Sequence, residues 1–140
     1  MKILALDIGD RWTGTALSDA LGMFAQPYKT IETTALNEFI KETITQEQIK
    51  TIIIGYPRTL RGTESEQTKK TKIIAAELNQ SFPSIEWTFW DERLTSKQAE
   101  KLKKTKTKEE KRISHSIAAA FILTGYLEHL YFQKNQYNKH

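Results

Sequence analysis

The chain has 140 residues, of which 39% are hydrophobic and 27% charged, and this composition is typical of one soluble globular domain. It has no cysteine, which excludes disulfides and thiolate metal sites, and no apolar run approaches the roughly 18 residues of a membrane span. The net charge of +4 is small, so its placement along the chain says more than its size. We expect a cytoplasmic protein without a signal peptide or membrane contact.

The first part of the chain predicts three strands and a helix. Strands are expected over residues 3–7, 12–18 and 23–28, joined by turns at Asp10-Arg11 and Gly22. Pro27 places the third strand near a sheet edge. Thr33 or Thr34 is then expected to cap a helix with an apolar stripe, which comprises Leu36, Phe39, Ile40 and Ile44.

The second part alternates strands and helices. The β-branched run over residues 51–55 predicts a strand buried on both faces. A loop follows to Gly62, and a capping box at 63–66 predicts a helix through Leu78. Residues 85–90 predict the last strand, a second capping box at 95–98 starts another helix, and residues 113–131 predict the closing helix.

This order of elements predicts an α/β protein with a ribonuclease-H-like fold. The sheet would be mixed and five-stranded, antiparallel at first and then crossed by helices on both faces. No repeat or linker interrupts the pattern. We therefore expect a single domain over residues 1–132 and a frayed polar tail over 133–140.

Three short strings contain groups that suit a divalent cation. Asp7 ends the first apolar strand, Glu92 follows the last strand, and His115 lies in Ser-His-Ser near the start of the closing helix. Asp91 would point to the opposite side of the pleat from Glu92. Carboxylates converging from separate elements are the ligands that a pair of Mg²⁺ or Mn²⁺ ions needs to hydrolyse a phosphodiester. The alternative is that Asp7 only starts a turn and that Glu92 only forms an ion pair at a strand end.

Four motifs carry a resemblance to a known family. They are residues 6–9 with 14–19, residues 55–57 with Gly62, residues 90–95, and residues 115–119 with 122–123. In order and spacing they resemble the YqgF/RuvX family, relatives of the RuvC Holliday-junction resolvases. The resemblance implies a metal-dependent nuclease of the bacterial cytoplasm that processes the 5′ end of precursor 16S ribosomal RNA, with junction resolution on branched DNA as an alternative.

His115 departs from that family, whose motif usually has Asp at this position. A neutral imidazole can bind Mn²⁺ but is a poor ligand for Mg²⁺. It could instead act as a general acid or base, or be an uninvolved residue near a helix start. The substitution raises the question of how complete the catalytic site is.

Basic residues predict contacts with the nucleic-acid backbone. Residues 101–112 carry a net charge of +5, so the rest of the chain sums to about −1, and an anionic partner is expected at this segment. A merely solvated lysine run is the alternative. The candidate phosphate contacts are Arg58, Arg61, Arg93, Lys103, Lys104, Lys106 and Lys108.

Three functions therefore compete. The first is a metal-dependent nuclease acting on structured RNA, in the context of the pre-ribosome, or on branched DNA. The second is a nucleic-acid-binding module that has lost efficient chemistry, as His115 would allow. The third is a kinase or ATPase of the actin and sugar-kinase type, whose first phosphate loop also reads Asp-x-Gly, but the chain is too short for two lobes and lacks the second loop. The oligomeric state is not predictable from these patterns.

Overall fold

The computed structural model describes residues 1–56, 66–91 and 108–138, and within the last segment it describes the side chains of 114–135. The elements in chain order are β1 (Lys2–Ile8), β2 (Trp12–Ser18), β3 (Ala25–Glu32), the 3₁₀ turn η1 (Thr33–Ala35), α1 (Leu36–Glu47), β4 (Ile49–Tyr56), α2 (Glu66–Ser81), β5 (Glu86–Asp91) and α4 (Lys108–Asn138). None of the helices in these segments is long and apolar enough to cross a membrane.

The strands of the described segments form one mixed sheet in the order β3-β2-β1-β4-β5. The pairs β1–β2 and β2–β3 are antiparallel, whereas β1–β4 and β4–β5 are parallel. This arrangement confirms the predicted mixed sheet and places β3 at an edge. The carboxyl ends of β1, β4 and β5 consequently meet at one edge of the sheet, where ligand sites of parallel sheets usually form.

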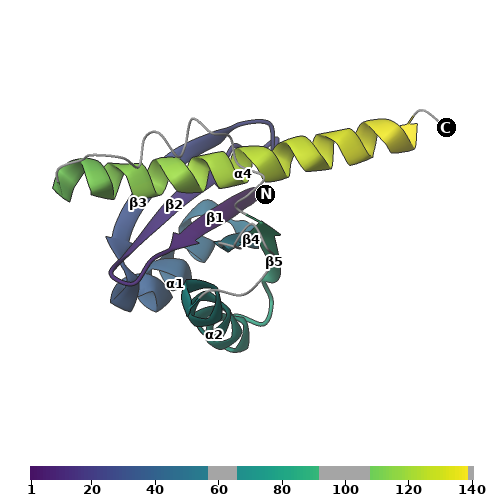
Figure 1. Ribbon diagram of the computed structural model, residues 1–140. Coiled ribbons are helices and arrows are strands. Elements are labelled where there is room, and N and C mark those ends of the chain that lie inside the picture. The colour runs from purple at the N-terminus through teal and green to yellow at the C-terminus, as the bar shows by residue number, and fades with distance from the viewer. Residues whose placement is uncertain (57–65, 92–107, 139–140) are drawn as a thin grey trace.

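Helices cover both faces of the sheet (Figure 1). Because side chains alternate along a strand, Leu4 and Leu6 of β1 pack with α1 and α2, whereas Ala5 packs with α4. The face toward α4 is lined by small side chains, including Ala5 and Ala16. Small residues let a helix backbone approach a sheet closely, so this face fixes α4 near the end of β1.

Three predicted boundaries change. The third strand runs from Ala25 to Glu32 instead of over 23–28, because its pairing with β2 continues to the partners Trp12 and Glu32. The closing helix starts at Lys108 instead of 113, and the start of the helix predicted from 95–98 lies outside the described residues. The closing helix also extends to Asn138, so most of the residues predicted as a polar tail are helical.

The predicted threonine cap is wrong. Thr33 lies in η1, and the residue that precedes α1 is Ala35, which has no side-chain cap. The Thr33 hydroxyl instead donates a hydrogen bond to the carbonyl oxygen of Gly9 at 2.7 Å. A tertiary partner has therefore replaced the local capping bond.

The last strand contributes to both cores. Trp87 packs against the core beneath α1 and α2, and Trp90 packs against the core beneath α4. The Trp90 ring lies 5.6 Å from that of Tyr126, edge to face. Burial and the nearby Glu86 carboxylate raise the pKa of Tyr126, against a smaller lowering by a hydrogen bond with Thr88. The phenol therefore stays protonated at neutral pH in this contact between β5 and α4.

Candidate active site

Asp7 lies near the carboxyl end of the central strand β1. In the sheet register it faces Gly14 on β2 and Gly55 on β4, and it is only 8% exposed. Alternation along β1 places its side chain on the same face as Ala5, toward α4. A carboxylate in this position is flanked on both neighbouring strands by residues without side chains.

His115 of α4 lies opposite Asp7. Its Nδ1 atom is 3.7 Å from Oδ2 of Asp7, and its side chain is 33% exposed. The two residues are more than a hundred positions apart in the chain, and they come together because α4 crosses β1 and β2. The structure thus brings these two groups together, and their catalytic roles stay predictions.

Gly14 makes this approach of α4 possible. A Cβ atom built on Gly14 would lie 2.0 Å from the carbonyl oxygen of His115 and 2.6 Å from the backbone nitrogen of Ser116. Both atoms are backbone, so no side-chain rotation could relieve the overlap. Gly14 therefore sets the position of α4, and with it the position of the His115 imidazole.

The turn after Asp7 is held by a set of short hydrogen bonds. The Gly9 N–H donates to the carbonyl of Trp12 at 2.9 Å, and the Thr33 N–H donates to that of Arg11 at 2.8 Å. The Thr33 hydroxyl also meets the hydroxyl of Thr13 at 2.9 Å. Thr33 was not recognised as a residue of this site from the sequence, because its only visible signal was that of a helix cap.

The remaining predicted site residues fall outside the part of the chain that the structure describes. This applies to Glu92, Arg58, Arg61, Arg93, Lys103, Lys104 and Lys106, and to the side chain of Lys108, which is the first residue of α4. Asp91 ends β5 and pairs with Tyr56 in the sheet register. Among the described residues no three His, Cys, Asp or Glu side chains cluster as a metal site would require; Asp7 and His115 supply two groups of the predicted three.

Asp7 and His115 present one carboxylate oxygen and one imidazole nitrogen to the same space. Two ligand atoms at about 2.1 Å from one ion lie about 3.0 Å apart at a right angle and about 4.2 Å apart when opposite. The separation of 3.7 Å between Nδ1 and Oδ2 matches neither arrangement, so a shared ion would require a small shift of one side chain. One carboxylate oxygen and one imidazole nitrogen form a donor set that favours Mn²⁺ over Mg²⁺.

Comparison with known proteins identifies relatives over nearly the whole chain. The RuvX family, described as Holliday junction resolvase, matches residues 1–129. A protein of Carboxydothermus hydrogenoformans named "Putative pre-16S rRNA nuclease" is 40% identical over 135 residues, which cover 92% of this chain and 97% of that protein. A protein of the same name from Sulfurihydrogenibium is 41% identical over 140 residues, with coverages of 98% and 97%.

Solved structures share the fold at low sequence identity. A structure of Thermus thermophilus RuvC in complex with a Holliday junction substrate aligns with a TM-score of 0.58 at 13% identity and covers 91% of this chain and 93% of that one. The Fowlpox virus resolvase, in a complex with Holliday junction DNA, gives a TM-score of 0.54 at 14% identity, with coverages of 93% and 99%. These likenesses confirm the ribonuclease-H-like arrangement of sheet and helices.

Proposed function

Since the chain belongs to the RuvX family, we propose that it is a nuclease that hydrolyses phosphodiester bonds and processes the 5′ end of precursor 16S ribosomal RNA in the bacterial cytoplasm. Relatives of nearly equal length bear the name of such a nuclease. The substrate is structured RNA that is bound within the assembling ribosomal subunit. Branched DNA, named in the description of the family, is the alternative substrate.

The observation that carries this proposal is the meeting of Asp7 and His115 at the carboxyl edge of β1. A buried carboxylate and a partly exposed imidazole lie 3.7 Å apart, and glycines flank the carboxylate on both neighbouring strands. A carboxylate is costly to bury unless a cation or hydrogen bonds compensate it. Metal binding and proton transfer to water are the chemistries that such a pair can perform.

A divalent cation completes the proposed chemistry. Asp7, His115 and Glu92 would hold Mg²⁺ or Mn²⁺, with a two-ion arrangement as the full form of the site. Such ions neutralise the charge on the scissile phosphate and activate a water in line with the leaving oxygen. Trp90, two residues before Glu92, packs on the α4 side of the sheet, the side that also holds Asp7.

Arginines near the proposed metal ligands would bind the substrate backbone. Arg93 follows Glu92 directly, and Arg58 and Arg61 follow β4, the strand that neighbours β1. Guanidinium groups bind phosphate through paired hydrogen bonds. We assign these three residues to contacts with phosphates of the substrate.

The proposal is tested by cleavage of a labelled precursor 16S ribosomal RNA in Mn²⁺, in Mg²⁺ or in EDTA, with a branched DNA of matched label as the second substrate. We expect cleavage of the RNA in Mn²⁺ and none in EDTA. Cleavage of the branched DNA alone would replace the RNA substrate by the alternative. Cleavage of neither substrate, with RNA still bound, would favour a binding module without catalysis.

The first prediction is that Asp7→Asn abolishes this cleavage and leaves the protein folded. The change removes one charge from the proposed metal ligand and keeps the shape of the side chain. Asp19→Asn is the matched control, because Asp19 follows the end of β2 that is remote from Asp7, and it should cleave at the wild-type rate. Metal-dependent cleavage by pure Asp7→Asn protein would refute the site.

A further inference from the structure

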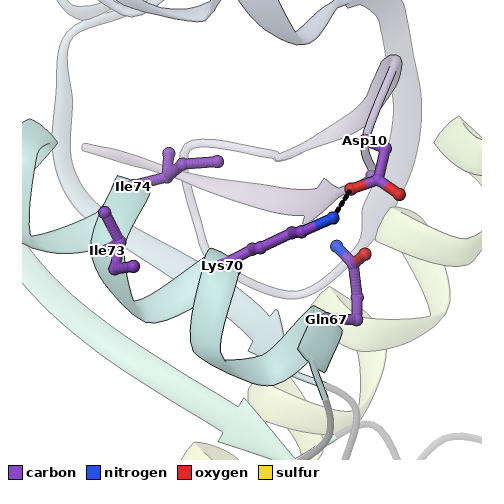
Figure 2. A pocket seen from close by; sticks show the side chains of 6 residues that line it. Asp10, Gln67, Lys70, Ile73 and Ile74 are labelled. Atoms are coloured by element: carbon purple, nitrogen blue, oxygen red, sulfur yellow. Dashed lines mark hydrogen bonds and ion pairs between the residues drawn. The ribbon is translucent and has the colours of Figure 1, made fainter.

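A groove lies beside the candidate active site, between the turn after β1 and helix α2 (Figure 2). It has a volume of about 290 Å³ and is lined by Gly9, Asp10, Gln67, Lys70, Ile73 and Ile74. Gly9 belongs to both places, because a Cβ atom built on it would lie 3.7 Å from Cε1 of His115. At Gly9 the groove therefore comes near the Asp7–His115 pair, although it lies on the α2 side of the sheet and the Asp7 side chain points toward α4.

We propose that this groove binds the nucleotide that flanks the scissile phosphate in the RNA strand. Lys70 contacts the neighbouring phosphate, and Ile73 contacts the ribose or the base. This inference rests on the proposed nuclease function, and it adds a path for the substrate strand from the Asp7–His115 pair onto helix α2.

The position of the groove is fixed relative to Asp7. The Gln67 side-chain amide donates a hydrogen bond to the carbonyl oxygen of Ile8 at 3.1 Å, and Ile8 is the residue after Asp7. This bond ties the first turn of α2 to the end of β1. A strand of RNA held at Asp7 would thus meet the α2 side chains in a constant geometry, as a substrate-positioning site requires.

Lys70 supplies a cation at the rim of the groove. Its Nζ lies 3.3 Å from Oδ1 of Asp10, and the two side chains are 57% and 68% exposed. An ion pair this exposed contributes little to folding stability. An ammonium group has three N–H donors, so the contact with Asp10 holds Lys70 over the groove (Figure 2) and leaves donors for a phosphate oxygen.

Ile73 supplies an apolar surface in the same groove. It is 61% exposed, whereas its neighbour Ile74 packs against the core beneath α1 and α2. An isoleucine this exposed buries little apolar surface in the core, but it offers an apolar contact for a base or for a ribose. A cation and an apolar contact side by side on one helix match the phosphate and the nucleoside of one nucleotide.

The test is a comparison of two neighbouring lysines. Binding of a labelled RNA that spans the 5′ cleavage region of precursor 16S ribosomal RNA is measured over a range of salt concentrations, in EDTA so that no cleavage occurs. Lys70→Gln should weaken RNA binding by about fivefold to tenfold. It should also reduce the magnitude of the slope of log affinity against log salt concentration by about 1. Lys69→Gln is the control, because Lys69 is 58% exposed, pairs with Glu66 and does not line the groove.

Two further variants separate the parts of the groove. Asp10→Asn should strengthen binding roughly threefold, because it removes a negative charge beside the bound phosphate. Ile73→Ala should weaken binding without a change in the salt slope, because no counterion is released at an apolar contact.

The outcomes distinguish this inference from the proposed function. If Lys70→Gln and Lys69→Gln weaken RNA binding equally while the wild-type protein binds and cleaves the RNA, the groove is not a nucleotide-binding site. The proposed nuclease function would then still hold. Failure of the wild-type protein to bind the RNA would overturn both. If Lys70→Gln weakens RNA binding, Lys69→Gln does not, and Asp10→Asn binds more tightly, the results would support nucleotide binding in the groove.

Discussion

At the scale of single residues, His115 determines how the candidate site can work. Its Nδ1 is 3.7 Å from the Asp7 carboxylate, and a small shift of one side chain would let the imidazole share a cation with Asp7. In the proposed site the imidazole would bind the cation through a ring nitrogen that carries no proton.

The second prediction follows from this pair. The wild-type protein should prefer Mn²⁺ to Mg²⁺, and His115→Asp should shift the preference toward Mg²⁺ because all ligands are then oxygens. His115→Ala should reduce the cleavage rate by about 100-fold or more. Cleavage rates of the three proteins in both metals measure these effects. An alanine variant with the full rate in both metals would remove His115 from the site and leave Asp7 and Glu92 standing.

The Asp19 carboxylate is fixed by backbone N–H donors in the loop between β2 and β3. Its Oδ1 accepts hydrogen bonds from the N–H groups of Met23 at 2.7 Å and Phe24 at 3.0 Å. The bond from Phe24 is the largest cause that lowers the pKa of Asp19, and the bond from Met23 acts in the same direction. The charged carboxylate therefore stabilises this loop.

The third prediction is the pH dependence of that loop. A group whose pKa is lower in the folded state stabilises the fold above its unfolded pKa, near 3.8 for Asp19, and this stabilisation is lost as the pH falls through the lower folded value. Wild-type protein should lose more stability on acidification than Asp19→Asn, which has no charge there to lose. Urea unfolding at neutral and acidic pH measures the difference. Parallel losses in the two proteins would contradict the assignment.

At the scale of elements, the contact between β2 and α4 determines whether the site forms. The backbone of α4 at His115 occupies the space that a side chain on residue 14 would need. Ala5 and Ala16 continue this row of small residues toward the other end of the sheet. A tight contact of this kind fixes the helix backbone that carries the imidazole.

The fourth prediction is that Gly14→Ala displaces α4. The added methyl group would overlap backbone atoms, so stability should fall by about 2 kcal/mol or more, and cleavage should fall at least tenfold (about 10²-fold is typical of small misplacements). Gly22→Ala is the control. Gly22 has a φ of +70 with no atom near the added Cβ, so this change should cost about 1 kcal/mol through backbone strain and leave the rate of the folded protein unchanged. Equal losses of activity in the two variants would contradict the role of Gly14.

The elements themselves were predictable from the sequence, whereas their contacts were not. The apolar run that ends at Asp7 and the β-branched run of β4 each carry a strand signal in the residues themselves. The Gly14–His115 contact and the bond from Thr33 to Gly9 depend on how distant elements meet. Local propensity contains no such information, and for this reason Thr33 was expected to cap a helix.

At the scale of the whole molecule, charge and site lie at the same end of helix α4. The lysine-rich segment 101–112 carries a net charge of +5 on a body that is close to neutral. It joins α4 at Lys108, which precedes His115 by two turns, or about 10 Å along the helix axis. Helix α4 itself lies across the sheet and extends beyond it at the other end (Figure 1). The segment is therefore joined to the molecule close to the proposed cleavage site.

The last prediction tests whether this segment binds RNA. Replacing Lys103, Lys104, Lys106 and Lys108 with Gln should weaken RNA binding and reduce the magnitude of the salt slope by about 3.6, because each lost phosphate contact lowers the number of released counterions by about 0.9. The control replaces four exposed lysines elsewhere, namely Lys29, Lys41, Lys50 and Lys134, and changes the net charge equally. If the charge acts only as a uniform field around the protein, both variants should lose affinity alike. A slope that falls only in the first variant would place the RNA backbone beside the start of α4, where the strand could reach Asp7 and His115.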